Sequence, residues 1–166
     1  MDALAQIALD QDKVVLRQAR REDIPALVAL IAADQLGATR DGIRDRADLE
    51  AYEQAFHAID RDPGHLLLVA ESPADGQIVG TMQLSFLPGL ARRGALRAQI
   101  EAVRVAESTR GTGLGGAMMR WAIEQARGRG CALVQLTSDK SRGDAHRFYE
   151  RLGFVSSHEG MKLKLS

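Results

Sequence analysis

A glycine-rich turn, RGTGLGG at residues 110–116, lies between an apolar segment that predicts a strand and an amphipathic segment that predicts a helix. The strand is residues 99–106 (QIEAVRVA), and one face of the helix carries Leu114, Met118, Trp121 and Ala122. Glycines at this point let the backbone approach a ligand closely, and the start of a helix presents N–H groups and the positive end of its dipole. The turn therefore predicts a site for a phosphate or pyrophosphate, with Arg110 adding a positive charge.

Other interpretations of the turn are a glycine-rich turn without a ligand and a dinucleotide site. Gly111, Gly113 and Gly116 match the GxGxxG pattern of dinucleotide-binding proteins. In that pattern the strand runs almost directly into the first glycine, whereas here residues 106–110 intervene. Only about fifty residues follow the turn, too few for the rest of a doubly wound sheet. No Gly-Lys-Ser/Thr follows the glycines, so the turn is not a P-loop.

The remaining pattern predicts one domain over residues 1–166 with an α/β (α+β) fold. Apolar or alternating segments predict strands at residues 13–18, 65–71, 77–87, 131–136, 154–155 and 161–165. Helical spacing recurs near residues 24–31, 49–59, 114–128 and 144–152. We expect a mixed, mostly antiparallel sheet flanked by about four helices. Residues 1–12 are compatible with a disordered tail.

Charge and cysteine content exclude several classes of function. Lys plus Arg is 22 and Asp plus Glu is 22, so we expect neither nucleic-acid nor membrane binding. The single cysteine, Cys131, forms no internal disulfide, and the four histidines lack zinc-site spacing, so we expect no metal. The N-terminus lacks the pattern of a signal peptide. We expect a soluble, cytoplasmic protein.

A second motif lies downstream of the turn. Residues 145–154 read AHRFYERLGF, and residues 110–115 also fit the frame R-x-x-G-x-G. Together, at this separation, the two segments resemble the GNAT superfamily of acetyl-CoA-dependent N-acetyltransferases, with its pyrophosphate motif R/Q-x-x-G-x-G/A and its later A-x-x-x-Y-x-x-x-G-F segment. The order of elements from residue 13 to residue 165 agrees with this resemblance.

The resemblance implies a sheet with a V-shaped splay in which pantetheine inserts. Backbone groups of Val103 and Val105 would bind the pantetheine, and the pyrophosphate would be held by Arg110, Gly111, Thr112, Gly113, Leu114 and Gly115. Tyr149 matches the family's usual general acid, although its helical spacing also suits a core residue. The implied activity is transfer of acetyl from acetyl-CoA to a primary amine by direct attack in a ternary complex. We expect a small-molecule amine rather than a protein N-terminus or lysine, and a homodimer is common in the family.

Glu101 is the candidate base. On a regular strand it shares a face with Val103 and Val105, and some family members place a catalytic acidic residue on this strand. The alternative is an exposed strand-end glutamate, or one in an ion pair, for instance with Arg104 or Arg97. Arg142 stands where many members have a cofactor-binding Asn, so that contact is not inherited. Either Arg142 or Lys140 could instead bind a CoA phosphate; the alternative is that both are solvated charges on a loop.

Two surfaces bear on the nature of the acceptor, and they favour acceptors of opposite charge. Residues 34–53 are rich in carboxylates, which would attract a cationic amine or would form an ordinary charged surface. The loop of residues 87–96 carries Arg92 and Arg93, which favour an acceptor with a carboxylate or phosphate. An alternative function from another class is a non-catalytic acyl-CoA-binding or regulatory module.

Overall fold

A computed structural model describes residues 3–9, 12–34 and 36–165. Its sheet has six strands in sequence order: β1 (Ala3–Ala8), β2 (Lys13–Gln18), β3 (His65–Glu71), β4 (Ile78–Leu87), β5 (Arg97–Val105) and β6 (Leu133–Leu136). Neighbouring strands are antiparallel from β1 to β5, and β6 lies parallel to β5. This confirms the expected mixed, mostly antiparallel sheet.

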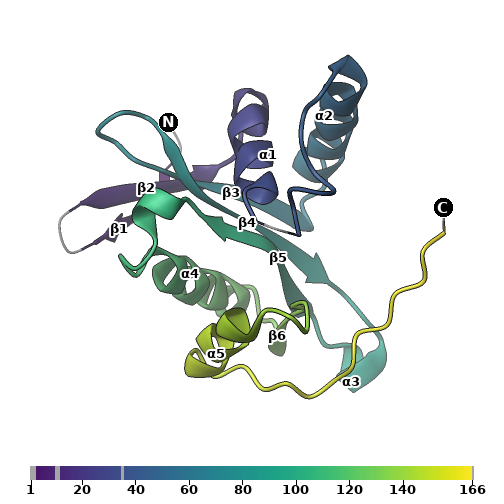
Figure 1. The fold of residues 1–166 in the computed structure, drawn as a ribbon. Helices are drawn as coiled ribbons and strands as arrows, with labels where there is room; N and C mark the ends of the chain where they lie inside the picture. Colours follow the sequence, from purple (N-terminus) through teal and green to yellow (C-terminus); the bar gives the residue numbers. More distant parts are fainter. Residues whose placement is uncertain (1–2, 10–11, 35, 166) are drawn as a thin grey trace.

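Helices cover both faces of the sheet (Figure 1). One face carries α1 (Ile24–Ala32) and α2 (Arg46–Asp60), and the other carries α4 (Leu114–Gly128) and α5 (Gly143–Arg151). The expected four helices are therefore present. Shorter elements are the single turn α3 (Ala91–Gly94) and the 3-10 turns η1 (Arg21–Asp23) and η2 (Glu107–Thr109).

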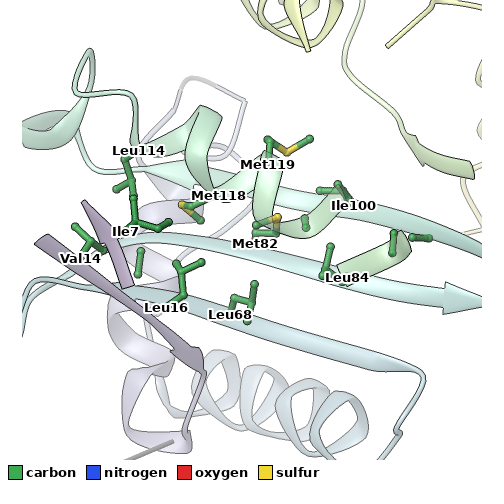
Figure 2. Close-up of a cluster of buried hydrophobic side chains, with 14 of the residues drawn as sticks. Ile7, Val14, Leu16, Leu68, Met82, Leu84, Ile100, Leu114, Met118 and Met119 are labelled. Carbon is green, nitrogen blue, oxygen red and sulfur yellow. The ribbon is translucent and has the colours of Figure 1, made fainter. Parts of the chain in front are cut away.

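The larger hydrophobic core lies between the sheet and α4 (Figure 2). Leu68, Met82 and Leu84 on the central strands are fully buried, as are Met118 and Met119 on α4. Alternate residues of each strand point to this side, which is why the apolar positions recur every second residue. A smaller cluster, which includes Phe56 and Val69, packs under α1 and α2.

The two ends of the chain differ from the sequence prediction. The supposed tail contains β1, which pairs antiparallel with β2 and buries Ile7 in the core. The two final strands, predicted at residues 154–155 and 161–165, are absent from the described structure. Phe154 packs on the core, but the residues after it extend away from the sheet and pair with no strand (Figure 1). The alternating Met161, Leu163 and Leu165 side chains are consequently exposed.

An ion-pair network is buried beneath η1. The Arg17 guanidinium donates to both carboxylate oxygens of Asp23, at 2.7 and 2.9 Å, and to Glu71 at 2.5 Å. Arg17 and Asp23 are only 5% and 6% exposed. Burial opposes ionisation of Asp23, but the hydrogen bonds from Arg17 and from the Arg20 amide leave its pKa below the ordinary value.

We predict that Arg17→Met lowers the free energy of unfolding by about 3–5 kcal/mol, because Asp23 is then left charged and unpaired in a buried position. Urea unfolding at neutral pH measures this. The matched control is Arg46→Gln, whose exposed pair with Glu50 contributes little. Because the pKa of Asp23 is lower in the folded state than in the unfolded state, the network stabilises the wild-type fold fully when the pH is above the unfolded-state pKa. This stabilisation is lost as the pH falls through the folded-state pKa. Equal stability of the Arg17 variant and wild type at neutral pH would contradict the prediction.

Candidate functional site

The glycine-rich turn leads from β5 through η2 into α4. Gly111 and Gly113 have φ angles of 79° and 84°, in the left-handed region that favours glycine. A Cβ added at either would meet no atom within 4 Å, so the space in front of the turn is open. Leu114 is buried, and it therefore presents only its backbone to the turn. The side chain of Arg110 is exposed at the start of the turn.

The backbone N–H groups at the start of α4 are available to a ligand. No side chain caps Gly113, the N-cap residue. Among the described residues, the N–H groups of residues 113–116 have no hydrogen-bond acceptor, while the Thr112 hydroxyl donates to the Thr109 carbonyl at 2.7 Å. Adjacent N–H donors at a helix start, beside an exposed arginine, fit a phosphate or pyrophosphate.

Strand β5 contains a bulge at Ala102. Thr81 of β4 pairs with Arg104 and Gln83 pairs with Glu101, so two β5 residues lie opposite Met82. Ala102 has φ 51°, a left-handed conformation within the strand. A bulge of this kind bends the strand and changes which side chains share a face.

Strands β5 and β6 separate just before the bulge. Their parallel pairing ends at Ile100 and Leu136, and no β6 residue in the described chain pairs with residues 101–105. The expected V-shaped splay is therefore present, and Val103 and Val105 lie on its open edge. Unpaired strand N–H and C=O groups are a ready template for an extended amide-containing ligand.

The bulge overturns one sequence prediction about Glu101. Val103 and Val105 pack toward the core on the α4 side, and Val105 lies close to Gly115. Glu101, beside Ile100 of that core, faces the α1 and α2 side, so it does not share a face with the valines. Its carboxylate is exposed and accepts a hydrogen bond from Gln99 at 3.2 Å. The alternative of an exposed strand-end glutamate therefore describes this residue, but the ion pair with Arg97 or Arg104 does not form, and Arg104 pairs with Asp34 instead.

Polar residues surround Glu101 on this face of the sheet. Gln135 of β6 donates to Gln99 at 2.8 Å, and Gln99 in turn donates to Glu101. Nearby, the His65 ring is 2.8 Å from the Ser85 hydroxyl. Sequence reasoning did not select these residues, although Gln99 and Gln135 interrupt apolar strands where a buried sheet face would exclude amides.

Tyr149 lies on α5, half-buried beside the core. Its ring contacts Phe148 and Phe154 edge to face, with centroids 5.2 and 6.0 Å apart. Burial raises the pKa of the phenol, and the positive charges of Arg104 and Arg142 partly oppose that shift. The phenol therefore keeps its proton at neutral pH, as a proton donor requires. Tyr149 therefore packs on the core, as its helical spacing suggested, and carries a protonated phenol there.

Arg142 forms an ion pair that the sequence did not suggest. Its guanidinium is 2.5 Å from Asp34, which follows α1, and Arg104 of β5 approaches the same carboxylate oxygen at 3.1 Å. Arg142 is therefore not a solvated loop charge. Lys140, in contrast, is exposed and paired with Glu159. Asp34 and Arg142 are 108 residues apart, so no local pattern could have joined them.

The carboxylate-rich segment of residues 34–53 is largely neutralised by arginines. Asp48 pairs with Arg44, Glu50 with Arg46 and Glu53 with Arg21. This favours the ordinary charged surface over an attractive rim for cations. In the loop of residues 87–96, Arg92 and Arg93 are exposed and have left-handed backbone angles.

Within the part of the chain that the structure describes, no group of three or more His, Cys, Asp or Glu side chains is placed to hold a metal ion. No helix in residues 3–9, 12–34 and 36–165 is both long and apolar enough to cross a bilayer.

We predict that Gly113→Ala weakens binding of a pyrophosphate-containing ligand about tenfold and lowers stability by about 1 kcal/mol. The alanine Cβ meets no atom, so the cost comes from forcing φ 84° on a residue with a side chain. The control is Gly128→Ala, at the last residue of α4, which we expect neither to weaken ligand binding nor to lower stability. Calorimetric titration and urea unfolding measure the two effects. Unchanged affinity in the Gly113 variant would contradict this role of the turn.

Comparisons with known proteins agree with these observations. The model of the Acetyltransferase (GNAT) family matches residues 30–154. Aminoalkylphosphonate N-acetyltransferase of Salmonella typhimurium is 31% identical over 144 residues, which is 86% of each chain. Glucosamine 6-phosphate N-acetyltransferase of Trypanosoma brucei brucei is 39% identical over 90 residues, 54% of this chain and 59% of that protein. The crystal structure of a transcriptional regulator from Bacillus halodurans C-125 is 43% identical, with a TM-score of 0.85 over 92% of this chain and 99% of that one.

Proposed function

The chain belongs to the acetyltransferase (GNAT) family, and from that membership we propose that it transfers an acetyl group from acetyl-CoA to a primary amine of a small molecule. The attack is direct, within a ternary complex. The single observation that carries the proposal is that the open edge of β5 leads directly into the glycine-rich turn and its uncapped helix start. The two acetyltransferases described above are named for small amine acceptors, which supports the same class here.

The residues present fit acetyl-CoA. The N–H groups of residues 113–116, together with Arg110, Gly111 and Thr112, suit the pyrophosphate. Val103 and Val105 have no β6 partner in the described chain, which suits the amides of pantetheine; the Val103 carbonyl accepts a hydrogen bond from Arg104 at 2.9 Å, which pantetheine would replace. Acetyl-CoA supplies the activated acetyl thioester when it is bound.

Two side chains are proposed to transfer the protons of the reaction, one from the amine and one to the thiolate. The attacking amine must lose a proton, because a protonated amine has no lone pair, and Glu101 is the proposed base, directly or through a water. The departing thiolate needs a proton, and Tyr149 is the proposed donor. The raised pKa of the phenol, caused by its burial, supports that role.

Thiol release tests the proposal. The protein is incubated with acetyl-CoA and a panel of primary amines, free thiol is followed over time, and the product is identified by mass spectrometry. We expect amine-dependent release of CoA and an N-acetylated product. Binding of acetyl-CoA without release in the presence of any small amine or peptide would contradict the proposed activity.

One observation favours a second function, an acyl-CoA-binding regulatory module. The Bacillus halodurans protein, 43% identical over nearly its whole length, is a transcriptional regulator. Such a module would bind acetyl-CoA and show no turnover, so the same assay separates the two functions. A protein N-terminus or lysine as acceptor is distinguished by the peptide arm of the panel.

Family membership alone supports a homodimer in the cytoplasm, and we include both in the proposal. Light scattering on the purified chain measures the oligomeric state, with a mass near twice 18.0 kDa as the expected result.

A further inference from the structure

Two arginines share one carboxylate, that of Asp34. Arg142 and Arg104 share a single oxygen of Asp34, at 2.5 and 3.1 Å. The other Asp34 oxygen accepts the Gly37 amide at 2.6 Å. The cluster therefore carries two positive charges and one negative charge.

The guanidinium groups keep donors that the protein does not use. The Arg104 Nε atom is buried and makes no hydrogen bond, although it lies within ion-pair distance of Asp34. Arg142 uses one of its nitrogens, on Asp34, and Arg104 uses only Nη1, on the Val103 carbonyl, among the described residues. A half-buried guanidinium with unsatisfied donors destabilises the protein unless another group accepts hydrogen bonds from those donors.

The cluster lies on the acceptor side of the sheet. Because of the bulge at Ala102, Arg104 faces the same side as Glu101, with Thr81 and Gln83 as their neighbours on β4. Three residues of strand span on the order of 10 Å, and the arginine side chain reaches back over part of that distance. The side chains of Arg104 and Arg142 are 20% and 30% exposed, so a small ligand can reach them.

We propose that the acceptor amine carries a phosphonate or phosphate group, and that Arg104 and Arg142 bind it while the amine lies near Glu101. This inference rests on the proposed acetyl transfer. Arg104 and Arg142 carry two positive charges against the single negative charge of Asp34, so a further anionic group is needed to balance the cluster. Guanidinium forks bind phosphorus oxyanions in a bidentate manner, using the donors that remain unsatisfied here. The spacing to Glu101 suits a short aminoalkyl chain between the nitrogen and the phosphorus.

Matched acceptors test the proposal. With acetyl-CoA saturating, kcat/KM is measured for 2-aminoethylphosphonate, O-phosphoethanolamine, β-alanine and ethylamine. We expect the two phosphorus compounds to exceed ethylamine by at least about 100-fold, because ethylamine has no anionic group to accept hydrogen bonds from the arginines. We expect a smaller excess over β-alanine, whose carboxylate has only one negative charge and two oxygens. Comparison of the first two distinguishes a phosphonate from a phosphate ester. Equal kcat/KM for β-alanine or ethylamine and the phosphorus compounds would overturn the proposal.

Variants assign the effect to the cluster. Arg104→Gln and Arg142→Gln should each lower kcat/KM for the preferred acceptor by about 10- to 100-fold more than they lower kcat/KM for ethylamine. Arg46→Gln, an exposed arginine paired with Glu50, is the matched control. Equal losses with ethylamine and the phosphorus acceptor would show a purely structural ion pair and overturn the assignment.

A binding measurement keeps this test separate from the activity. Methylphosphonate, which has no amine, is titrated calorimetrically into the wild-type protein in the presence of CoA. Binding to wild type that is weakened at least tenfold in Arg104→Gln supports the site even if no amine is acetylated, in which case only the proposed transfer fails. No binding to the wild-type protein would overturn the site, whatever amines are acetylated.

Discussion

Replacing Tyr149 with Phe is expected to lower kcat by about 10²- to 10⁴-fold and to leave the dissociation constant for acetyl-CoA unchanged. The substitution keeps the ring, and therefore the edge-to-face contacts with Phe148 and Phe154. Only the proton that the departing thiolate needs is lost. Single-turnover kinetics and calorimetric titration measure the two quantities.

The pH dependence of kcat gives an independent check on Tyr149. A proton donor works only while it is protonated, so activity falls as pH rises through its pKa. Burial raises that pKa above the ordinary tyrosine value, with Arg104 and Arg142 opposing the shift, so the alkaline limb should lie above the range of an exposed phenol. In Tyr149→Phe the limb should disappear. An unchanged kcat and alkaline limb in the variant would show that Tyr149 only packs on the core.

Replacing Glu101 with Gln is expected to lower kcat/KM about 100-fold near pH 7, because the acceptor amine is then protonated and has lost its base. The defect should shrink as pH approaches the amine's own pKa, about 10, since the amine then loses its proton to solvent. The ratio of wild-type to variant kcat/KM across pH measures this. Glu124→Gln, which removes an exposed carboxylate on α4, is the control. A defect that does not depend on pH would contradict the role of a base.

The sequence was sufficient for most of the architecture around the site. The turn of residues 110–116, the helix that follows it and the second motif around Tyr149 depend on local spacing, and each element formed where that spacing indicated. The order of strands followed because short connections join antiparallel neighbours. Local patterns of this kind predict the structure correctly because the apolar positions that form each pattern are the positions buried in the core.

Other features depend on contacts that no local pattern contains. The bulge at Ala102 adds one residue to β5, which moves Val103 and Val105 to the α4 side and leaves Glu101 facing the same side as Arg104. Strict alternation, the rule used to read the strand, fails at such a point. The ion pair between Asp34 and Arg142 joins distant loops and requires the tertiary structure. Strand β1 was missed because only Ile7 of its side chains is buried.

Thermal unfolding with separately titrated ligands tests most directly whether the glycine-rich turn and the open β5 edge bind acetyl-CoA. A ligand at about 100 times its dissociation constant stabilises a protein by about 2.7 kcal/mol, a shift of a few degrees for a chain of this size. We predict that acetyl-CoA and CoA each raise the unfolding temperature by this amount, that NAD and NADP do not, and that Gly113→Ala reduces the shift. A protein stabilised by NAD or NADP alone, or by none of the four ligands, would contradict the account.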